Sequence, residues 1–118
     1  MSAAERKNFE KPDESRPFPR GRIDLVDVGG AQIGRLTLEP GWRWSEHVQP
    51  MAGTTWCEAP HFQYRVAGTL RILMSDGTEL DAVAGDVTAL PSGHDAWVVG
   101  DEPAVVVDWW GATDYARG

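Results

Sequence analysis

The three histidines of the chain, His47, His61 and His94, are the residues best suited to do chemistry. Imidazole is the commonest protein ligand for zinc, copper, iron and nickel. Each histidine lies at the start or end of a predicted strand, beside a turn or loop that contains glycine or proline. Strand ends at the mouth of a β-barrel are where binding residues gather. Three imidazole ligands leave a coordination position open, which is typical of a catalytic metal centre.

The predicted strand that begins at His61 has a polar face. Successive side chains of a strand point to opposite faces, so His61, Gln63 and Arg65 share one face and the apolar residues between them take the other. A polar row inside a small barrel is costly unless it binds something. We expect Gln63 and Arg65 to orient a substrate, Arg65 through a bidentate contact to a carboxylate. The alternative is that this polar face is exposed to solvent.

Cys57 is the only cysteine, so it cannot form a disulfide within the chain, and three residues separate it from His61. A thiolate at this place is a candidate fourth metal ligand, and it favours zinc, iron or copper over magnesium. The alternative for Cys57 is a small buried apolar residue. Trp56 and Trp97 flank the histidines and are candidates for the wall of an apolar or aromatic ligand pocket, or else for core or dimer contacts.

Strands must position these residues. Glycine and proline interrupt the chain about every eight to twelve residues, a spacing typical of the turns in a β-sandwich or barrel. Asp76-Gly77 is a strong two-residue hairpin turn. In the predicted strand 42–48, His47 shares a face with Arg43 and Ser45. Strands are predicted at residues 23–28, 31–38, 42–48, 61–66, 70–74, 79–83, 87–90, 94–99 and 104–110.

The bulk properties limit the possible classes of protein. A chain of 118 residues fits one domain, predicted at residues 21–118 after a flexible, charged and proline-containing arm at residues 1–20. The net charge of −7 argues against a nucleic-acid partner. The sequence shows neither a run of 18 apolar residues nor a secretory signal, so we expect no membrane partner and a cytoplasmic location.

Two motifs in residues 40–97 resemble those of the cupin superfamily. Its first motif runs glycine, five residues, His-x-His, three or four residues, glutamate, six residues, glycine; here five residues separate Gly41 from His47, and six separate His61 from Gly68. Its second motif runs glycine, five residues, Pro-x-Gly, two residues, histidine, and residues 85–93 match the first part. The segments PGWRWSEHV and PSGHDAWVVGDEP also resemble a branch of small bacterial single-domain cupins.

The resemblance implies a single antiparallel β-barrel or jelly roll, a homodimer, and one divalent metal (zinc, iron, copper, nickel or manganese). His61 stands at the glutamate position of the motif, and His94 lies two residues before the position of the final histidine, now Ala96. The spacing from Cys57 to His61 is that between the family's second histidine and its glutamate, so Cys57 is a candidate replacement ligand.

The implied function is a metal-dependent, oxygenase- or isomerase-like enzyme acting on a small organic molecule. The alternatives are a non-catalytic module that binds or senses a small ligand, and a subunit whose barrel only mediates assembly.

Overall fold

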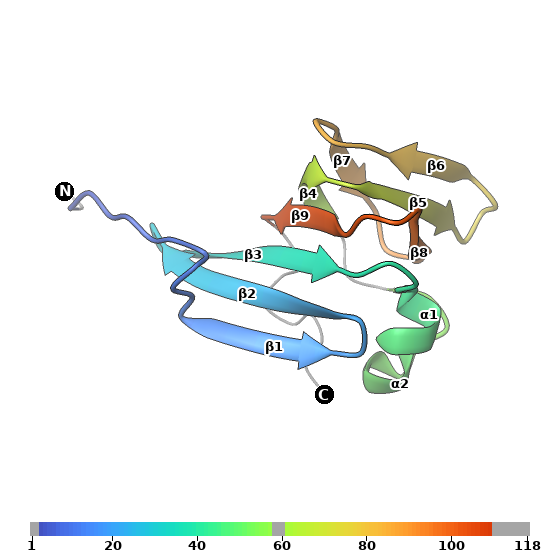
Figure 1. The fold of residues 1–118 in the computed structure, drawn as a ribbon, viewed down its shortest axis with the longest axis horizontal. Coiled ribbons are helices and arrows are strands. Elements are labelled where there is room, and N and C mark those ends of the chain that lie inside the picture. Colours follow the sequence, from blue (N-terminus) through green and yellow to red (C-terminus); the bar gives the residue numbers. More distant parts are fainter. Residues whose placement is uncertain (1–2, 58–60, 110–118) are drawn as a thin grey trace.

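The computed structural model of the protein describes residues 3–57 and 61–109. Within them the chain forms nine strands in two antiparallel sheets, together with two short helices (Figure 1). The predicted all-β jelly-roll class is therefore confirmed. The strands and helices are β1 (Glu14–Phe18), β2 (Gly21–Val28), β3 (Ala31–Leu38), α1 (Trp44–His47), α2 (Gln49–Ala52), β4 (His61–Ala67), β5 (Thr69–Met74), β6 (Glu79–Ala82), β7 (Val87–Leu90), β8 (His94–Val99) and β9 (Ala104–Asp108).

The larger sheet has the strand order β1-β2-β3-β9-β4-β7, and the smaller one has the order β6-β5-β8. The chain crosses between them at Gly68, the residue that separates β4 from β5. The predicted Asp76-Gly77 hairpin is present, and Gly77 has the positive φ of 93° that such a turn requires. The last strand was predicted at residues 104–110 and is observed as β9, Ala104–Asp108. Residue 110 lies outside the described residues.

The N-terminal arm predicted at residues 1–20 differs from the structure. Residues 14–18 form β1, which pairs with β2 in the register Glu14↔Leu25 to Phe18↔Gly21. Buried Phe18 packs edge-on against the ring of Trp42, with 6.5 Å between the ring centroids. The domain therefore begins before residue 21, because a charged segment with one well-placed aromatic residue can still add an edge strand.

The strand predicted at residues 42–48 is wrong. Trp42 and Trp44 are both buried, as their alternation predicts, but the chain then turns into α1. The first turn is held from outside the helix, since the backbone N–H of Ser45 donates to Asp95 Oδ1 at 3.1 Å. The N–H of Arg43 donates to His47 Nδ1 at 2.9 Å. A two-residue apolar alternation fits both a strand and this lead-in to a helix, so it could not distinguish them.

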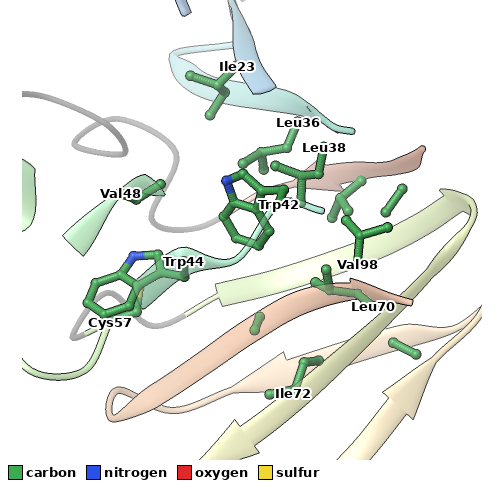
Figure 2. Close-up of a cluster of buried hydrophobic side chains, with 14 of the residues drawn as sticks. Ile23, Leu36, Leu38, Trp42, Trp44, Val48, Cys57, Leu70, Ile72 and Val98 are labelled. Atoms are coloured by element: carbon green, nitrogen blue, oxygen red, sulfur yellow. The ribbon is translucent and has the colours of Figure 1, made fainter. Parts of the chain in front are cut away.

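The hydrophobic core lies between the two sheets and joins side chains from both (Figure 2). Leu36 and Leu38 come from β3 of the larger sheet, and Leu70 and Ile72 come from β5 of the smaller sheet. Trp42, Trp44 and Val48 belong to the same core. No helix in the described part of the chain is long and apolar enough to cross a membrane.

Candidate metal centre

Cys57, His61 and His94 converge in the interior between the sheets. One side-chain donor atom from each lies within 4.8 Å of the others, and all three residues are buried. His61 begins β4 of the larger sheet, and His94 begins β8 of the smaller one. Cys57 forms an isolated bridge beside His94, with its N–H donating to the His94 carbonyl at 2.8 Å. Backbone pairing therefore fixes where all three donors lie.

The spacing of these donors fits a metal ion. Zinc bonds of about 2.3 Å to sulfur and 2.0–2.1 Å to nitrogen, at tetrahedral angles, place a sulfur and a nitrogen ligand roughly 3.6 Å apart. Cys57 Sγ and His61 Nε2 lie 3.6 Å apart. The two imidazole rings meet edge to face, with 5.3 Å between their centroids. One sulfur and two nitrogen donors thus fit one divalent ion with a further position open.

Each histidine is oriented by a hydrogen bond on its other ring nitrogen. His61 Nδ1 lies 2.5 Å from Asp108 Oδ2, and His94 Nδ1 lies 3.0 Å from the Pro91 carbonyl. A carbonyl only accepts, so His94 Nδ1 carries the proton and leaves Nε2 with a free lone pair. A metal ion bound between the donors would take the place of the proton on His61 Nε2, the nitrogen that faces Cys57 Sγ. A carboxylate or carbonyl that holds the second nitrogen is the usual support of a metal-binding histidine.

The charges of this cluster favour the thiolate. Burial by itself raises the pKa of the Cys57 thiol, but the hydrogen bonds and charges of His61 and His94 outweigh burial and lower that pKa to about 6. Burial by itself lowers the pKa of His61, but Asp108 and Cys57 raise that pKa to about 9. Without a metal the two side chains therefore form a thiolate–imidazolium pair, in which sulfur is already the species that metals bind.

A cavity of about 30 Å³ adjoins the three donors. One enclosed water needs about 10–15 Å³ on this measure, so the space fits an ion with one or two small ligands. The described residues that line the cavity are mostly apolar. They are Leu36, Leu38, Trp42, Trp44, Cys57, His61, Gln63, Leu70, Leu90, His94, Ala96 and Val106.

The polar face of β4 points inward, which decides between the inward and the exposed orientation that the sequence left open. His61, Gln63 and Arg65 are buried, whereas Tyr64 and Val66 on the opposite face are 38% and 48% exposed. Gln63 Nε2 donates to Asp108 Oδ2 at 3.2 Å and the side chain lines the cavity. Arg65 is fully buried but is not among the residues that line the cavity.

Three residues predicted for the site lie elsewhere. His47 is in α1, where its Nδ1 accepts the N–H of Arg43, and it is not in the donor group that the described residues form. Its predicted place beside the other ligands depended on the strand that the structure replaces with a helix. The Arg43 guanidinium stacks on Trp97, with its Cζ 4.3 Å from the centroid of the Trp97 ring. Trp56 is half-buried. Neither tryptophan lines the cavity.

Asp108, Trp42 and Trp44 were not predicted for the site from the sequence. Asp108 shares the inward face of β9 with Ala104 and Val106, so the alternation of that strand was the signal for it. An acidic residue that ends a buried apolar face needs a partner, and His61 is that partner. Trp42 and Trp44 line the cavity, whereas Trp56 and Trp97, chosen for their closeness to histidines in the sequence, do not.

No protein-family model matches this chain, and no curated protein does. Solved structures do. An oxalate decarboxylase from Lactobacillus farciminis, in complex with formate, is 18% identical over 86% of this chain and 32% of its own, with a TM-score of 0.61. A sugar phosphate isomerase of the cupin superfamily from Silicibacter pomeroyi is 22% identical over 83% of this chain and 73% of its own, with a TM-score of 0.58.

The chain has the cupin fold. A protein of unknown function from Acinetobacter sp. ADP1, 14% identical over 83% of this chain and 90% of its own, has a similar structure with a TM-score of 0.62. The chain spans about a third of the length of the oxalate decarboxylase. At these identities the likeness shows the cupin architecture and leaves the chemistry to the residues of this chain.

Two kinds of chemistry are open to the cluster of Cys57, His61 and His94. The first is metal binding by Cys57, His61 and His94. The second is nucleophilic catalysis, because Cys57, His61 and Asp108 form a thiol–imidazole–carboxylate series with contacts of 3.6 Å and 2.5 Å. The two differ in what His94 contributes, and in how far Cys57 must be open to a substrate.

Proposed function

We propose that this cupin is a metal-dependent enzyme, of the oxygenase or isomerase type, that acts on a small organic molecule. The observation that carries the proposal is the meeting of three buried donor atoms within 4.8 Å, one from each of Cys57, His61 and His94. A bound metal would supply a Lewis acid, or the means to activate water or dioxygen, at its open position.

Burial favours the metal over a thiol nucleophile. Cys57 is only 5% exposed, whereas a nucleophilic thiol must reach the carbon of its substrate. A Cys-His-Asp series also has no use for a second imidazole, yet His94 lies within the same donor group. Its Nδ1 bond to Pro91 leaves its Nε2 free to bind a metal. All three donors therefore have a role only in the metal centre.

The donor set narrows the choice of metal. Thiolate sulfur is a soft ligand that suits zinc, iron and copper, and imidazole suits these ions and nickel. Manganese, which the sequence analysis also allowed, prefers carboxylate and water oxygen. We therefore expect zinc, iron or copper. Gln63 lines the cavity beside the donors and would orient the substrate, and Arg65, two residues further along the same face, would supply positive charge.

The test is the metal content of the purified protein by elemental mass spectrometry, after reconstitution with each candidate ion. We expect about one metal per chain, lost in His61→Ala and strongly reduced in Cys57→Ser. His47→Ala is the matched control, because it removes an imidazole that lies outside the donor group. Wild-type protein that takes up none of these ions would refute the metal centre.

A non-catalytic module with a structural metal is the second candidate, and the small size of the cavity favours it. A volume of about 30 Å³ is far below the roughly 300–1,000 Å³ of typical ligand pockets. An enzyme must open this cavity or use a very small substrate. Azide added to the cobalt-loaded protein distinguishes the two: a changed visible spectrum shows an exchangeable position, as an enzyme needs. An unchanged spectrum shows a closed, structural centre.

The remaining expectations from the sequence stay predictions. They are a homodimer, a cytoplasmic location, a small-molecule partner rather than a nucleic acid, and a role for Trp56 and Trp97 in binding the substrate. For Trp97 to bind the substrate, its ring must move away from the Arg43 guanidinium, on which it now stacks.

A further inference from the structure

The outward side of β9, β4 and β7 is an apolar surface. These three strands are consecutive in the larger sheet (Figure 1). Their inward side chains belong to the core and the candidate metal centre, and their outward side chains carry no charge. The outward residues, termed the outer face, are Phe62, Tyr64, Val66, Val87, Ala89, Val105, Val107 and Trp109.

Cross-strand pairing makes the outer face continuous. Tyr64 is the register partner of both Val87 on β7 and Val107 on β9. The Phe62 ring lies 5.7 Å from the Trp109 ring, measured between the ring centroids. Side chains that are paired across neighbouring strands are close enough to contact one another. The eight residues therefore form one patch instead of scattered apolar positions.

The N-terminal segment of the chain reaches the neighbouring part of the sheet but not the outer face. Arg35 of β3 is the register partner of Val107 and lies at the border. Its guanidinium lies over the Phe9 ring, 5.3 Å from the centroid, and donates to Glu10 at 2.8 Å. Beyond this border the side chains stay exposed, up to 60% in the case of Val87.

The patterns of β9 and β4 are typical of strands that are covered on both faces. In β9, Ala104–Asp108, apolar residues follow one another, so Val105 and Val107 point outward while their neighbours point into the core. In β4 the polar row points inward and the apolar row points outward. A strand with one face in water has the opposite arrangement, with apolar residues inside and polar residues outside.

The area of the outer face suits an interface. Its most exposed large residues are Tyr64 at 38%, Trp109 at 41%, Val66 at 48% and Val87 at 60%. At about 250 Å² for a fully exposed aromatic residue and about 150 Å² for a valine, these four present roughly 350 Å². One side of a standard homodimer interface buries about 800 Å², of which about 65% is apolar. The outer face therefore supplies most of the apolar surface that such an interface requires.

We propose that the outer face is the interface of a homodimer, in which a second copy of the chain covers the same eight residues across a two-fold axis. A two-fold interface joins like surfaces, and an apolar surface can pack against its own copy. The chain has a net charge of −7, so charged surfaces of two copies repel each other, whereas the outer face brings no charges together. Tyr64 and Trp109 are of the residue types that most often anchor interfaces.

This proposal does not depend on the metal centre. Its donors include His61, which begins β4 and is buried on the inward side of that strand, whereas the outer face is on the opposite side. Metal uptake and dimer formation can therefore succeed or fail separately.

The first test is sedimentation velocity of the wild-type protein at concentrations up to about 100 µM, which detects dimers with a Kd in the micromolar range. We expect a dimer whose Kd stays the same or falls between about 0.1 and 1 M sodium chloride, because salt screens the repulsion between two acidic copies. Wild type that remains monomeric at 100 µM overturns the second copy as the occupant and leaves the face to a different protein. A Kd that rises tenfold or more with salt indicates an interface of ion pairs and also overturns the proposal.

Tyr64→Glu and Met51→Glu form the matched pair of variants. Their exposed fractions are 38% and 37%, but Met51 lies in α2, outside the outer face. We expect Tyr64→Glu to weaken the dimer at least a hundredfold, because it buries like charges from both copies, and Met51→Glu to leave Kd within about twofold. A dimer that survives Tyr64→Glu, or one that Met51→Glu dissociates, overturns the proposal.

Val87→Glu keeps the test decisive if Tyr64→Glu does not fold. Val87 is the most exposed large residue of the outer face and lies on the edge strand β7, so it tolerates a charged side chain in the monomer. Circular dichroism checks that the variant is folded. We expect Val87→Glu to weaken the dimer at least tenfold, and a folded variant that dimerises like the wild type overturns the interface.

Discussion

Asp108 holds two side chains of the site at once, because its Oδ2 contacts His61 Nδ1 at 2.5 Å and Gln63 Nε2 at 3.2 Å. It therefore orients a candidate metal ligand and the amide beside it from a position that binds no metal itself. Removing the charge of Asp108 should leave the donor atoms present but poorly directed.

We predict that Asp108→Asn lowers metal affinity about 10- to 100-fold, the usual effect of losing a carboxylate that supports a metal-binding histidine. Competition with a chromophoric chelator measures the affinity. Asp101→Asn, at an exposed loop position, is the control and should match the wild type. Equal affinities for all three proteins would show that Asp108 does not support a metal ligand.

At the level of single residues the sequence predicted several side chains that the structure brings together in the candidate site. His61 and His94 could be chosen because histidine is rare in this chain and because their turns resemble the cupin motifs. Gln63 and Arg65 followed from strand alternation alone. His47 was misplaced and Asp108 was missed because both depend on how distant segments pack. Asp108 meets His61, 47 residues away in the sequence, only because β9 pairs with β4.

Gly68 decides how the two sheets join. It has a φ of +75°, and a Cβ built there would lie 2.3 Å from the Pro103 carbonyl oxygen and 2.7 Å from the Ala104 Cα. These contacts are backbone atoms of the segment that leads into β9, so they cannot move aside independently. A methyl group would force β4, β5 and β9 apart.

We predict that Gly68→Ala destabilises the protein by about 3 kcal/mol or more, through overpacking and backbone strain together. Gly77→Ala is the control, because Gly77 has a similarly positive φ of 93° but no atom within 4 Å of the built Cβ. Gly77→Ala should lower the free energy of unfolding by about 1–2 kcal/mol, which is the cost of holding alanine in the left-handed conformation. Urea unfolding measures both, and equal losses would remove the packing role assigned to Gly68.

Asp24 ties the first three strands together. Its buried carboxylate accepts from Ser15 Oγ at 2.8 Å, from Arg35 at 3.0 Å and from Arg22 at 3.2 Å. Burial acts to raise the pKa of Asp24, but the hydrogen bonds of Ser15 and Arg35 and the charges of both arginines hold that pKa below its usual 3.8. The ionised form is therefore the one that stabilises the fold.

A lowered pKa in the folded state gives stability that is present above the unfolded pKa and is lost as the pH falls through the folded pKa. We predict that Asp24→Asn lowers the free energy of unfolding at pH 7 by about 1–3 kcal/mol. The variant should also lose less stability than the wild type between pH 5 and pH 2. Unfolding curves across that range measure both effects, and parallel pH profiles would contradict the assignment.

Among the elements, the strands after residue 20 were predictable, whereas β1 and the two helices were not. Turns such as Asp76-Gly77 contain residues with a strong local preference, so the strand limits beside them were read correctly. The helix α1 depends on Asp95, fifty residues away, which accepts the N–H of Ser45. The sequence around residues 42–48 contains no signal of that contact.

For the whole molecule, the candidate metal centre is a link between the two sheets. His61 belongs to the larger sheet and His94 to the smaller one, while Cys57 reaches them from the segment before β4. A metal held by all three would join these parts. It would add to stability because the unfolded chain does not hold the donors together.

We predict that chelation lowers the Tm of the metal-loaded protein by about 10 °C, corresponding to metal at a hundred times its Kd. Cys57→Ser should respond much less, because it binds little metal to begin with. Differential scanning calorimetry with and without chelator measures the change. A Tm that chelator leaves unaltered in metal-loaded wild type would mean that the ion does not link the sheets.

The most direct test of the central claim is X-ray absorption spectroscopy at the metal edge of the reconstituted protein. For zinc, one sulfur neighbour at about 2.3 Å and two imidazole nitrogens at about 2.0–2.1 Å are predicted, with any remaining neighbour a light atom. That result would identify Cys57, His61 and His94 as the ligands, since Cys57 is the only source of thiolate. A shell of oxygen and nitrogen without sulfur would contradict the account.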